Sequence, residues 1–276
     1  MKKIIAFMAA AAMSLSLFAL DIFNYVQING NVKTLVQTDY DIGSKFGNLT
    51  RTPAIKTVTT LDTAGRAIEV TELTPRDAII SKTANKYDVY GNLTEQIAYD
   101  AESKVLWRNV FTYANGLKTD VSEYDKNGLL RAKTIFQYTD GKLADETGYD
   151  SDGALIWKIV YKYNAAGKTQ DVFEYSADGS LDLQETYTYL DDGKIESLTT
   201  YDTYTETSEK KVFRYASNGT LSEITTYDNT KQVTNRLIIK YDAGGNVSKV
   251  SEYNIANKFD TTVNELVSMK DITYVY

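Results

Sequence analysis

A regular spacing of tyrosines over the last two thirds of the chain most constrains how it can fold. Between residues 87 and 253 the step from one tyrosine of this series to the next alternates between 14 and 11 or 12 residues. Leu73 and Leu61 continue the same register towards the N-terminus, so the repeats begin near residue 55. A unit of 25 or 26 residues predicts stacked supersecondary elements. The series comprises Tyr87, Tyr99, Tyr113, Tyr124, Tyr138, Tyr149, Tyr163, Tyr175, Tyr189, Tyr201, Tyr215, Tyr227, Tyr241 and Tyr253.

Each unit contains two different strand patterns. One half ends in an apolar-x-Tyr triplet such as Phe111-Thr112-Tyr113 or Phe213-Arg214-Tyr215, and this alternation is typical of a β-strand. The other half ends in a lone tyrosine with an aliphatic residue three positions earlier, as in Val172 and Tyr175. An odd offset places these two side chains on opposite faces of a strand. We therefore expect apolar side chains on both faces of the sheet.

Short turns separate the strands, and many contain Asn-Gly or Asp-Gly, as in Asn115-Gly116 and Asp152-Gly153. Such pairs supply the positive φ angles of tight hairpins. Connections this short join only antiparallel neighbours. The sequence therefore predicts an all-β fold: an antiparallel up-and-down meander of about eight 25–26-residue β-hairpin repeats. We expect its sheet to be single-layered or partly spiralled.

Three segments are expected along the chain. Residues 1–19 resemble a signal peptide, because Lys2 and Lys3 precede an apolar stretch too short for a membrane span. Residues 20–55 are expected to form a capping hairpin, with strands over 22–28 and 32–36, followed by a loop over 43–53. Residues 56–276 form the repeat array.

Composition excludes several chemistries. The chain has no Cys and no His, so it lacks disulfides, thiolate nucleophiles, imidazole bases and zinc sites built from these residues. Its net charge of −7 disfavours nucleic acid as a partner. No later apolar run is long enough for a transmembrane helix. We expect no cofactor, no metal and no catalytic residue.

Two heptapeptides resemble the Tyr-Asp-x-x-Gly-Asn-Leu core of YD repeats, the RHS family. They are Tyr87-Asp88-Val89-Tyr90-Gly91-Asn92-Leu93 and Tyr241-Asp242-Ala243-Gly244-Gly245-Asn246-Val247. Weaker copies begin at Tyr124 and Tyr149, and the resemblance covers roughly residues 55 to 255. It implies a secreted or surface β-hairpin array of the kind that can spiral into a shell around a cargo.

Five residues form the candidate ligand site. Trp107 and Trp157 lie six residues before Tyr113 and Tyr163, two units apart, and Ala132 holds the equivalent position between them. Two strands per unit would place the indoles roughly 19 Å apart across a shallow groove floored by Ala132. The alternative is that these rings, like the rest of the tyrosine series, pack between strands.

Three other sequence patterns suggest further interpretations. Asp150-Ser151-Asp152-Gly153 resembles part of a calcium loop, but is more typical of a turn. Acid pairs such as Asp145 and Glu146 could serve a carboxylate-based carbohydrate-active enzyme, although nothing singles out one pair. An outer-membrane β-barrel is suggested by the terminal alternation Ile272, Tyr274, Tyr276, whereas charges of both parities in strands such as 117–124 disfavour it.

The sequence thus predicts an exported, non-enzymatic repeat protein that acts as a binding or scaffold module. We expect it in the periplasm, on the cell surface or secreted, with a protein or glycan of the cell envelope or host as its partner. The outer-membrane barrel and the carbohydrate-active enzyme remain the alternatives.

Overall fold

The computed structural model describes residues 22–45, 48–258 and 261–276 and is almost entirely β-structure. The expected signal peptide, residues 1–19, lies outside the described residues. One 3₁₀ turn, η1 (Ile22–Asn24), precedes the strands. Among the described residues, no helix is long and apolar enough to cross a membrane. The strands are β1 (Thr34–Lys45), β2 (Asn48–Leu61), β3 (Ala67–Leu73), β4 (Ile79–Tyr87), β5 (Leu93–Asp100), β6 (Val105–Ala114), β7 (Leu117–Asp125), β8 (Leu130–Thr139), β9 (Lys142–Asp150), β10 (Leu155–Tyr163), β11 (Thr169–Ser176), β12 (Leu181–Tyr189), β13 (Ile195–Asp202), β14 (Thr207–Tyr215), β15 (Leu221–Tyr227), β16 (Val233–Tyr241), β17 (Val247–Lys258) and β18 (Thr261–Val275).

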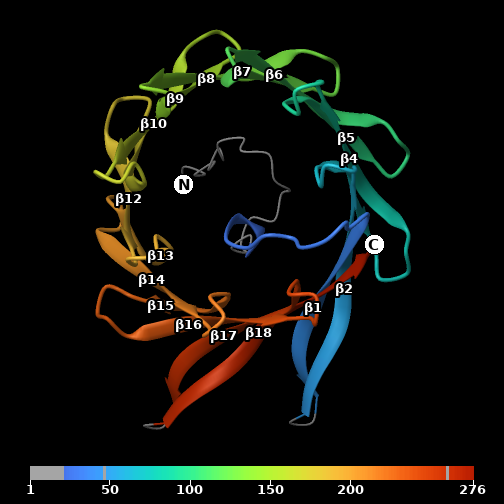
Figure 1. The fold of residues 1–276 in the computed structure, drawn as a ribbon, viewed down its shortest axis with the longest axis vertical. Coiled ribbons are helices and arrows are strands. Elements are labelled where there is room, and N and C mark those ends of the chain that lie inside the picture. The colour runs from blue at the N-terminus through green and yellow to red at the C-terminus, as the bar shows by residue number, and fades with distance from the viewer. Residues whose placement is uncertain (1–21, 46–47, 259–260) are drawn as a thin grey trace.

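The predicted antiparallel meander is confirmed, and its sheet closes on itself. Each strand pairs with the next along the chain, and β1 also pairs with β18 from Thr34↔Val275 to Asp41↔Ser268. The result is an 18-stranded barrel (Figure 1). The sequence predicts a single-layered or partly spiralled sheet without indicating whether it closes, and the pairing of β1 with β18 closes it. Closure pairs the two edge strands that an open layer would leave exposed.

Repeated β-bulges accompany the curvature. Most strand pairings contain a register shift, and many of these shifts fall next to a tyrosine of the repeat series, as at Thr112/Tyr113 and Arg214/Tyr215. A bulge adds an unpaired residue to one strand, bends it and increases its twist. Because nearly every unit carries such bulges, the bend accumulates around the ring.

The turns follow the predicted chemistry. At Asn115 and Gly116 both residues have positive φ, 53° and 78°, as a two-residue hairpin requires. In longer turns the Asp after the tyrosine caps the backbone: Asp150 Oδ1 accepts hydrogen bonds from the N–H groups of Asp152 and Ala154 at 2.9 and 2.8 Å. The segment that resembles a calcium loop is therefore built as a capped turn.

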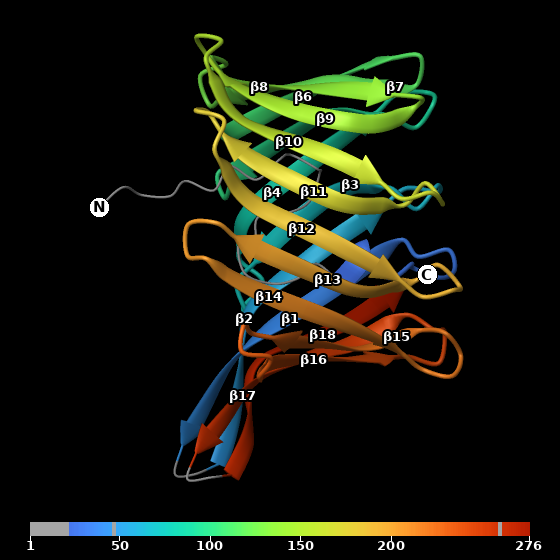
Figure 2. The same cartoon turned by 90° about the vertical axis from the view of Figure 1, so that its left-hand side faces the viewer.

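The N-terminal region differs from the expected capping hairpin. The hairpin is β1–β2, over residues 34–61, so strands occupy most of the segment expected to be a loop. This hairpin and β17–β18 are longer than the others, and their ends project outward from the ring at one rim of the barrel (Figures 1 and 2). Residues 25–33 contain no strand and run inside the ring to the start of β1 (Figure 1).

Asn246 holds this inner segment in place. Its Oδ1 accepts a hydrogen bond from the Asn29 N–H at 2.6 Å, and its Nδ2 donates to the Asn29 carbonyl at 3.0 Å. Phe23, Tyr25 and Val26 pack against a buried cluster on the strands. Asn29-Gly30-Asn31 therefore does not turn a hairpin, because Asn29 bonds to the wall instead. The cluster comprises Leu35, Leu198, Phe213, Leu221, Ile224, Ile239, Val247, Val250 and Ile272.

Candidate functional site: the inner wall of the barrel

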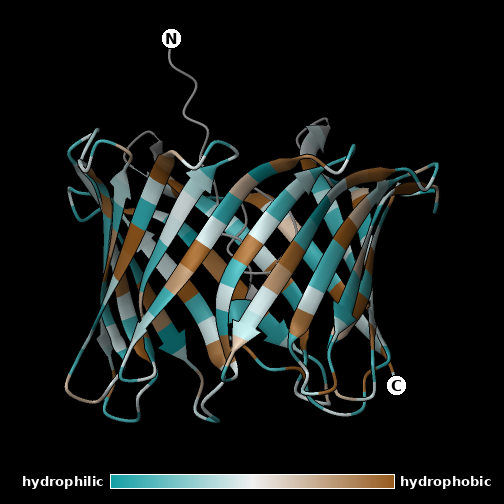
Figure 3. Ribbon diagram, turned by 90° about the horizontal axis from the view of Figure 1, so that it is seen from above, coloured by the Kyte–Doolittle hydropathy of each residue, from teal (hydrophilic) through white to brown (hydrophobic). Residues whose placement is uncertain are grey.

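The two faces of the wall carry different side chains. Since residues 22–33 run inside the ring and contact the cluster around Phe213 and Ile224, that cluster faces the lumen. Apolar and polar residues alternate along many strands (Figure 3). Following the strand register around the ring places a second cluster, Phe111, Val121 and Phe136, on the same inner face.

Tyrosines at the ends of the even-numbered strands cap the backbone of the inner wall. Tyr113 Oη donates a hydrogen bond to the Leu93 carbonyl at 3.0 Å, and Tyr163 Oη donates to the Leu143 carbonyl at 2.8 Å. The acceptor lies 20 residues earlier in both cases, and burial raises the pKa of both phenols. The same bond recurs for Tyr87, Tyr189, Tyr215 and Tyr241. This half of the series therefore has a structural role.

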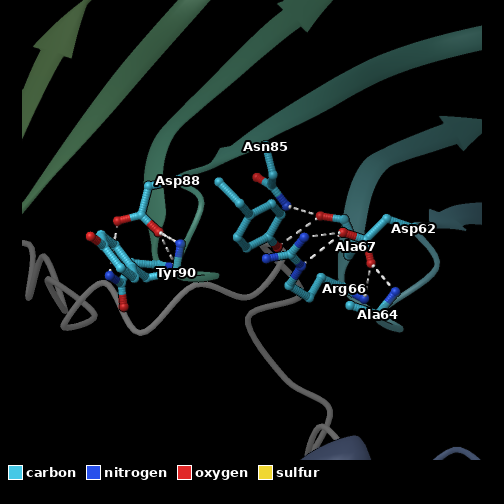
Figure 4. A network of polar contacts seen from close by, with 9 residues as sticks. Asp62, Ala64, Arg66, Ala67, Asn85, Asp88 and Tyr90 are labelled. Atoms are coloured by element: carbon cyan, nitrogen blue, oxygen red, sulfur yellow. Dashed lines mark hydrogen bonds and ion pairs between the residues drawn. The ribbon is translucent and has the colours of Figure 1, made fainter. Parts of the chain in front are cut away.

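Basic side chains at four of the turns cover the tyrosine of the next unit. Lys168 Nζ lies 5.0 Å from the centre of the Tyr189 ring and donates to the Gly193 carbonyl. Arg66 lies 4.7 Å over Tyr87 in the same way, beside the turn in which Asp62 accepts from Ala64 and Arg66 (Figure 4). Cation–π contact and hydrogen bonding thus link consecutive hairpins.

The five residues of the predicted groove all lie on the inner face, but they are not equally open. Trp157 is 9% exposed, and its indole lies on Gly148 of β9, where a Cβ would come within 2.3 Å of the ring. Ala132 is 8% exposed and pairs with Glu123 and Asp150, so it is not in the row of either indole. β-Bulges shift the pairing register between these strands, so Ala132 and the two indoles do not align across the sheet. Ligand binding by Trp107, Trp157, Ala132, Tyr113 and Tyr163 stays a prediction.

A larger hollow lies beside the inner N-terminal segment. It has a volume of about 600 Å³ and is open to the lumen. Its wall comes from β10 to β13, and Asn24 and Tyr25 close one side. The other lining residues are Ile159, Tyr161, Thr169, Val172, Glu174, Leu183, Glu185, Tyr187, Tyr189 and Ile195. We call this hollow the lumen pocket.

Two tyrosines of the lumen pocket donate to glutamates. Tyr161 Oη donates to Glu146 Oε1, and Tyr187 Oη donates to Glu185 Oε2, each at 2.7 Å. Burial and the neighbouring carboxylate raise the pKa of both phenols, so both remain neutral donors at physiological pH. Glu174 and Glu185 are not evident from the sequence, because their inward position depends on a strand register that the β-bulges shift.

The outer wall carries a belt of ion pairs near the middle of the strands. Several of its charged residues directly precede an inward residue, as Asp120 precedes Val121 and Glu223 precedes Ile224, so they point outward. Each acid lies beside a base on a neighbouring strand. The pairs are Glu69–Lys82 at 3.0 Å, Glu95–Arg108, Asp120–Lys133 at 3.3 Å, Asp145–Lys158 at 3.5 Å, Glu223–Arg236 at 2.7 Å and Asp271–Lys249 at 3.2 Å.

The other half of the tyrosine series lies on the outer wall near the rim from which the long hairpins project. Most of these tyrosines lie near the ends of the odd-numbered strands, and five of them pair with an aliphatic residue that begins the next strand. Ile79 and Leu155 near this rim are 47% and 39% exposed. The pairs are Tyr99↔Val105, Tyr124↔Leu130, Tyr149↔Leu155, Tyr175↔Leu181 and Tyr227↔Val233.

The described residues contain no group of three or more acidic side chains arranged to hold a metal ion. No family model matches the sequence, and no curated protein does. Among solved structures, a porin-like protein from Bacteroides uniformis matches over 89% of this chain and 98% of its own, at 10% identity and a TM-score of 0.50. A second porin-like protein, from Bacteroides vulgatus, matches over 88% and 98% at 12% identity and a TM-score of 0.33. The Photorhabdus luminescens Tc holotoxin pore matches over 76% of this chain and 20% of its own, at 12% identity and a TM-score of 0.17.

These likenesses concern the fold. The first covers nearly the whole of both chains and agrees with the 18-stranded ring. Closure and the porin-like match support the β-barrel named among the alternatives better than the binding or scaffold module. The YD-repeat resemblance is supported only as a repeated β-hairpin meander.

Proposed function

We propose that this chain is an exported, non-enzymatic β-barrel of the cell envelope whose lumen binds a ligand and whose outer wall faces water. The observation that carries the proposal is the distribution of side chains over the two faces. Buried apolar clusters and the lumen pocket lie on the inside, and the ion-pair belt lies on the outside.

The belt argues against a lipid-facing wall at mid-height. A spanning barrel presents an apolar band about 25 Å tall, and a Lys or Arg at its middle costs about 2 to 4 kcal/mol. Lys133 and Arg236 stand there with acidic partners. In water such pairs are well solvated, and linking neighbouring strands adds modestly to stability.

An outer-membrane barrel is the second candidate. It is favoured by the porin-like fold and by the outer tyrosine and aliphatic pairs near one rim, because aromatic girdles flank the apolar band of such barrels. These pairs occupy one rim, and the charged belt lies directly beside them. We therefore place this candidate after the water-facing barrel.

Fractionation of cells that produce the full chain tests the proposal. The protein is expected in the soluble fraction after osmotic shock or mechanical lysis, and it should stay monodisperse without detergent. The purified barrel should also enhance the fluorescence of N-phenyl-1-naphthylamine, a neutral apolar probe. Recovery only from outer membranes with detergent, or failure to bind any apolar probe, would overturn the proposal.

A further inference from the structure

The lumen pocket has one sign of charge. Glu174 and Glu185 belong to its lining, and Glu146 stands beside it as the strand partner of Ile159. Among the residues that the structure describes, no Lys or Arg lines the pocket. Glu174 pairs with Leu183 and Glu185 with Val172, so the two glutamates are diagonal neighbours on β11 and β12. Diagonal neighbours of this kind lie about 7 to 8 Å apart, close enough for one cation to contact both.

The remainder of the pocket is apolar and aromatic. Tyr25, Tyr161 and Tyr187 contribute rings, and Ile159 and Val172 contribute aliphatic surface. Flat rings and aliphatic side chains beside a few polar groups are the usual composition of a small-molecule site. The volume of about 600 Å³ lies within the range of sites for drug-sized ligands.

The three carboxylates differ in their hydrogen bonds. Glu185 and Glu146 each accept one from a tyrosine hydroxyl. Within the described part of the chain, the carboxylate of Glu174 has no hydrogen-bonding partner. Burial raises its pKa, and the charges of Asp182 and Glu185 raise it further. Lys168 lies at the edge of the pocket, over the Tyr189 ring, rather than among the residues that line it. A bound cation would supply the opposite charge directly beside Glu174 and so relieve both effects.

We infer that the lumen pocket binds an amphipathic cation, with its amine between Glu174 and Glu185 and its apolar body against Tyr25 and Tyr187. This inference rests on the proposed function and specifies its ligand class. The inner N-terminal segment is then part of the site, since Asn24 and Tyr25 close one side of the pocket.

Three probes with one fluorophore and different charges test the inference. Dansylcadaverine carries a primary ammonium, dansylamide is neutral, and dansylglycine is an anion. Titration into the full mature protein should show dansylcadaverine binding about tenfold or more tightly than dansylamide, because two close carboxylates attract only the cation. Dansylglycine should bind most weakly. The preference should shrink with added salt.

Matched variants locate the effect. The double variant Glu174→Gln with Glu185→Gln should lose about tenfold in affinity for dansylcadaverine and keep its affinity for dansylamide. Glu72→Gln is the control, because Glu72 also accepts a hydrogen bond from a hydroxyl, that of Ser81, but lies on β3, away from the pocket. Unchanged circular dichroism and melting establish that each variant is folded.

The outcomes separate the two levels of the proposal. If dansylamide binds as tightly as dansylcadaverine, the lumen is a binding site but the cation inference is wrong. The same conclusion holds if the double variant and Glu72→Gln lose equal affinity for dansylcadaverine. If none of the three probes binds, the proposed function itself fails. Preference for dansylcadaverine that the double variant abolishes supports both.

Discussion

At the scale of single residues, the tyrosines of the repeat series have different roles on the two faces of the wall. A tyrosine at the end of an even-numbered strand turns inward and caps a backbone carbonyl, as Tyr163 does at Leu143. A tyrosine at the end of an odd-numbered strand, such as Tyr149, turns outward beside Leu155. The spacing of 11 to 14 residues reveals both positions but does not distinguish their roles. The roles differ because the inward hydroxyl of Tyr163 lies within hydrogen-bonding distance of a backbone carbonyl of the neighbouring strand.

Tyr163→Phe should therefore destabilise the barrel, and Tyr149→Phe should be nearly neutral. The first change removes the donor to the half-buried Leu143 carbonyl, which costs about 1 kcal/mol. The second removes a hydroxyl on the outer wall and serves as the control. Urea unfolding of both variants measures the difference. Equal losses of unfolding free energy would contradict the structural role assigned to the inner series.

At the scale of elements, the position of the inner N-terminal segment depends on one copy of the YD-like heptapeptide. Asn92 and Asn246 occupy the same place in the two best YD-like heptapeptides. The Asn92 side chain donates to Asp88 within its own turn, at 2.9 Å. Asn246 is 1% exposed and bonds to the Asn29 backbone and the Tyr276 hydroxyl. The same residue type thus closes a turn in one copy and docks a distant segment in the other.

Asn246→Ala should release residues 23–33 from the wall. It leaves the Asn29 N–H and carbonyl without their partner, at a cost of about 1 to 3 kcal/mol. Hydrogen exchange of the backbone amides between residues 25 and 33 should accelerate, while the strands of β4 to β9 keep their protection. Asn92→Ala should leave exchange in this segment unchanged. Unaltered protection in Asn246→Ala would show that Phe23, Tyr25 and Val26 suffice to hold it.

The elements were also the level at which the sequence was most informative. Period-two alternation and Asn-Gly or Asp-Gly turns located the repeated strands, because both are local properties of the chain. The sequence predicts a hairpin over residues 22–36, since Ile22 to Ile28 and Val32 to Val36 have strand-like composition around Asn-Gly-Asn. The contact that prevents this hairpin joins Asn29 to Asn246, 217 residues away. Long-range contacts of this kind leave no local pattern. The lumen pocket is also not evident from the sequence, because the inward orientation of its glutamates can be predicted only when the positions of the β-bulges are known.

At the scale of the whole molecule, closure decides what the two faces can do. An open meander would expose both faces to solvent, whereas a ring separates a lumen from an outer wall. In the ring, the apolar clusters and the acidic pocket line the lumen, and the ion pairs lie on the outer wall. Closure rests on the pairing of β1 with β18, so a test of that seam is a test of the barrel itself.

An engineered disulfide across the seam provides this test, since the natural sequence has no Cys. Val36 and Thr273 are Cα partners between β1 and β18, and Val36 and Val58 are Cα partners within the β1–β2 hairpin. Directly paired residues of antiparallel strands lie about 4.5 to 5.5 Å apart, within reach of a disulfide. The pair Val36→Cys with Thr273→Cys should oxidise within one molecule and close a loop of about 240 residues. The chain-entropy model gives this crosslink up to about 5 kcal/mol of stabilisation.

The pair Val36→Cys with Val58→Cys is the control, because it requires only the local hairpin. Its loop of roughly 22 residues should stabilise the protein less, by about 3 kcal/mol. A barrel forms both disulfides as monomers, which non-reducing electrophoresis and mass spectrometry detect. An open sheet brings only the control cysteines together and leaves Cys at positions 36 and 273 free or joined between molecules. The larger increase in melting temperature for the seam crosslink would then be absent, and the separate lumen on which the binding proposals depend would be absent with it.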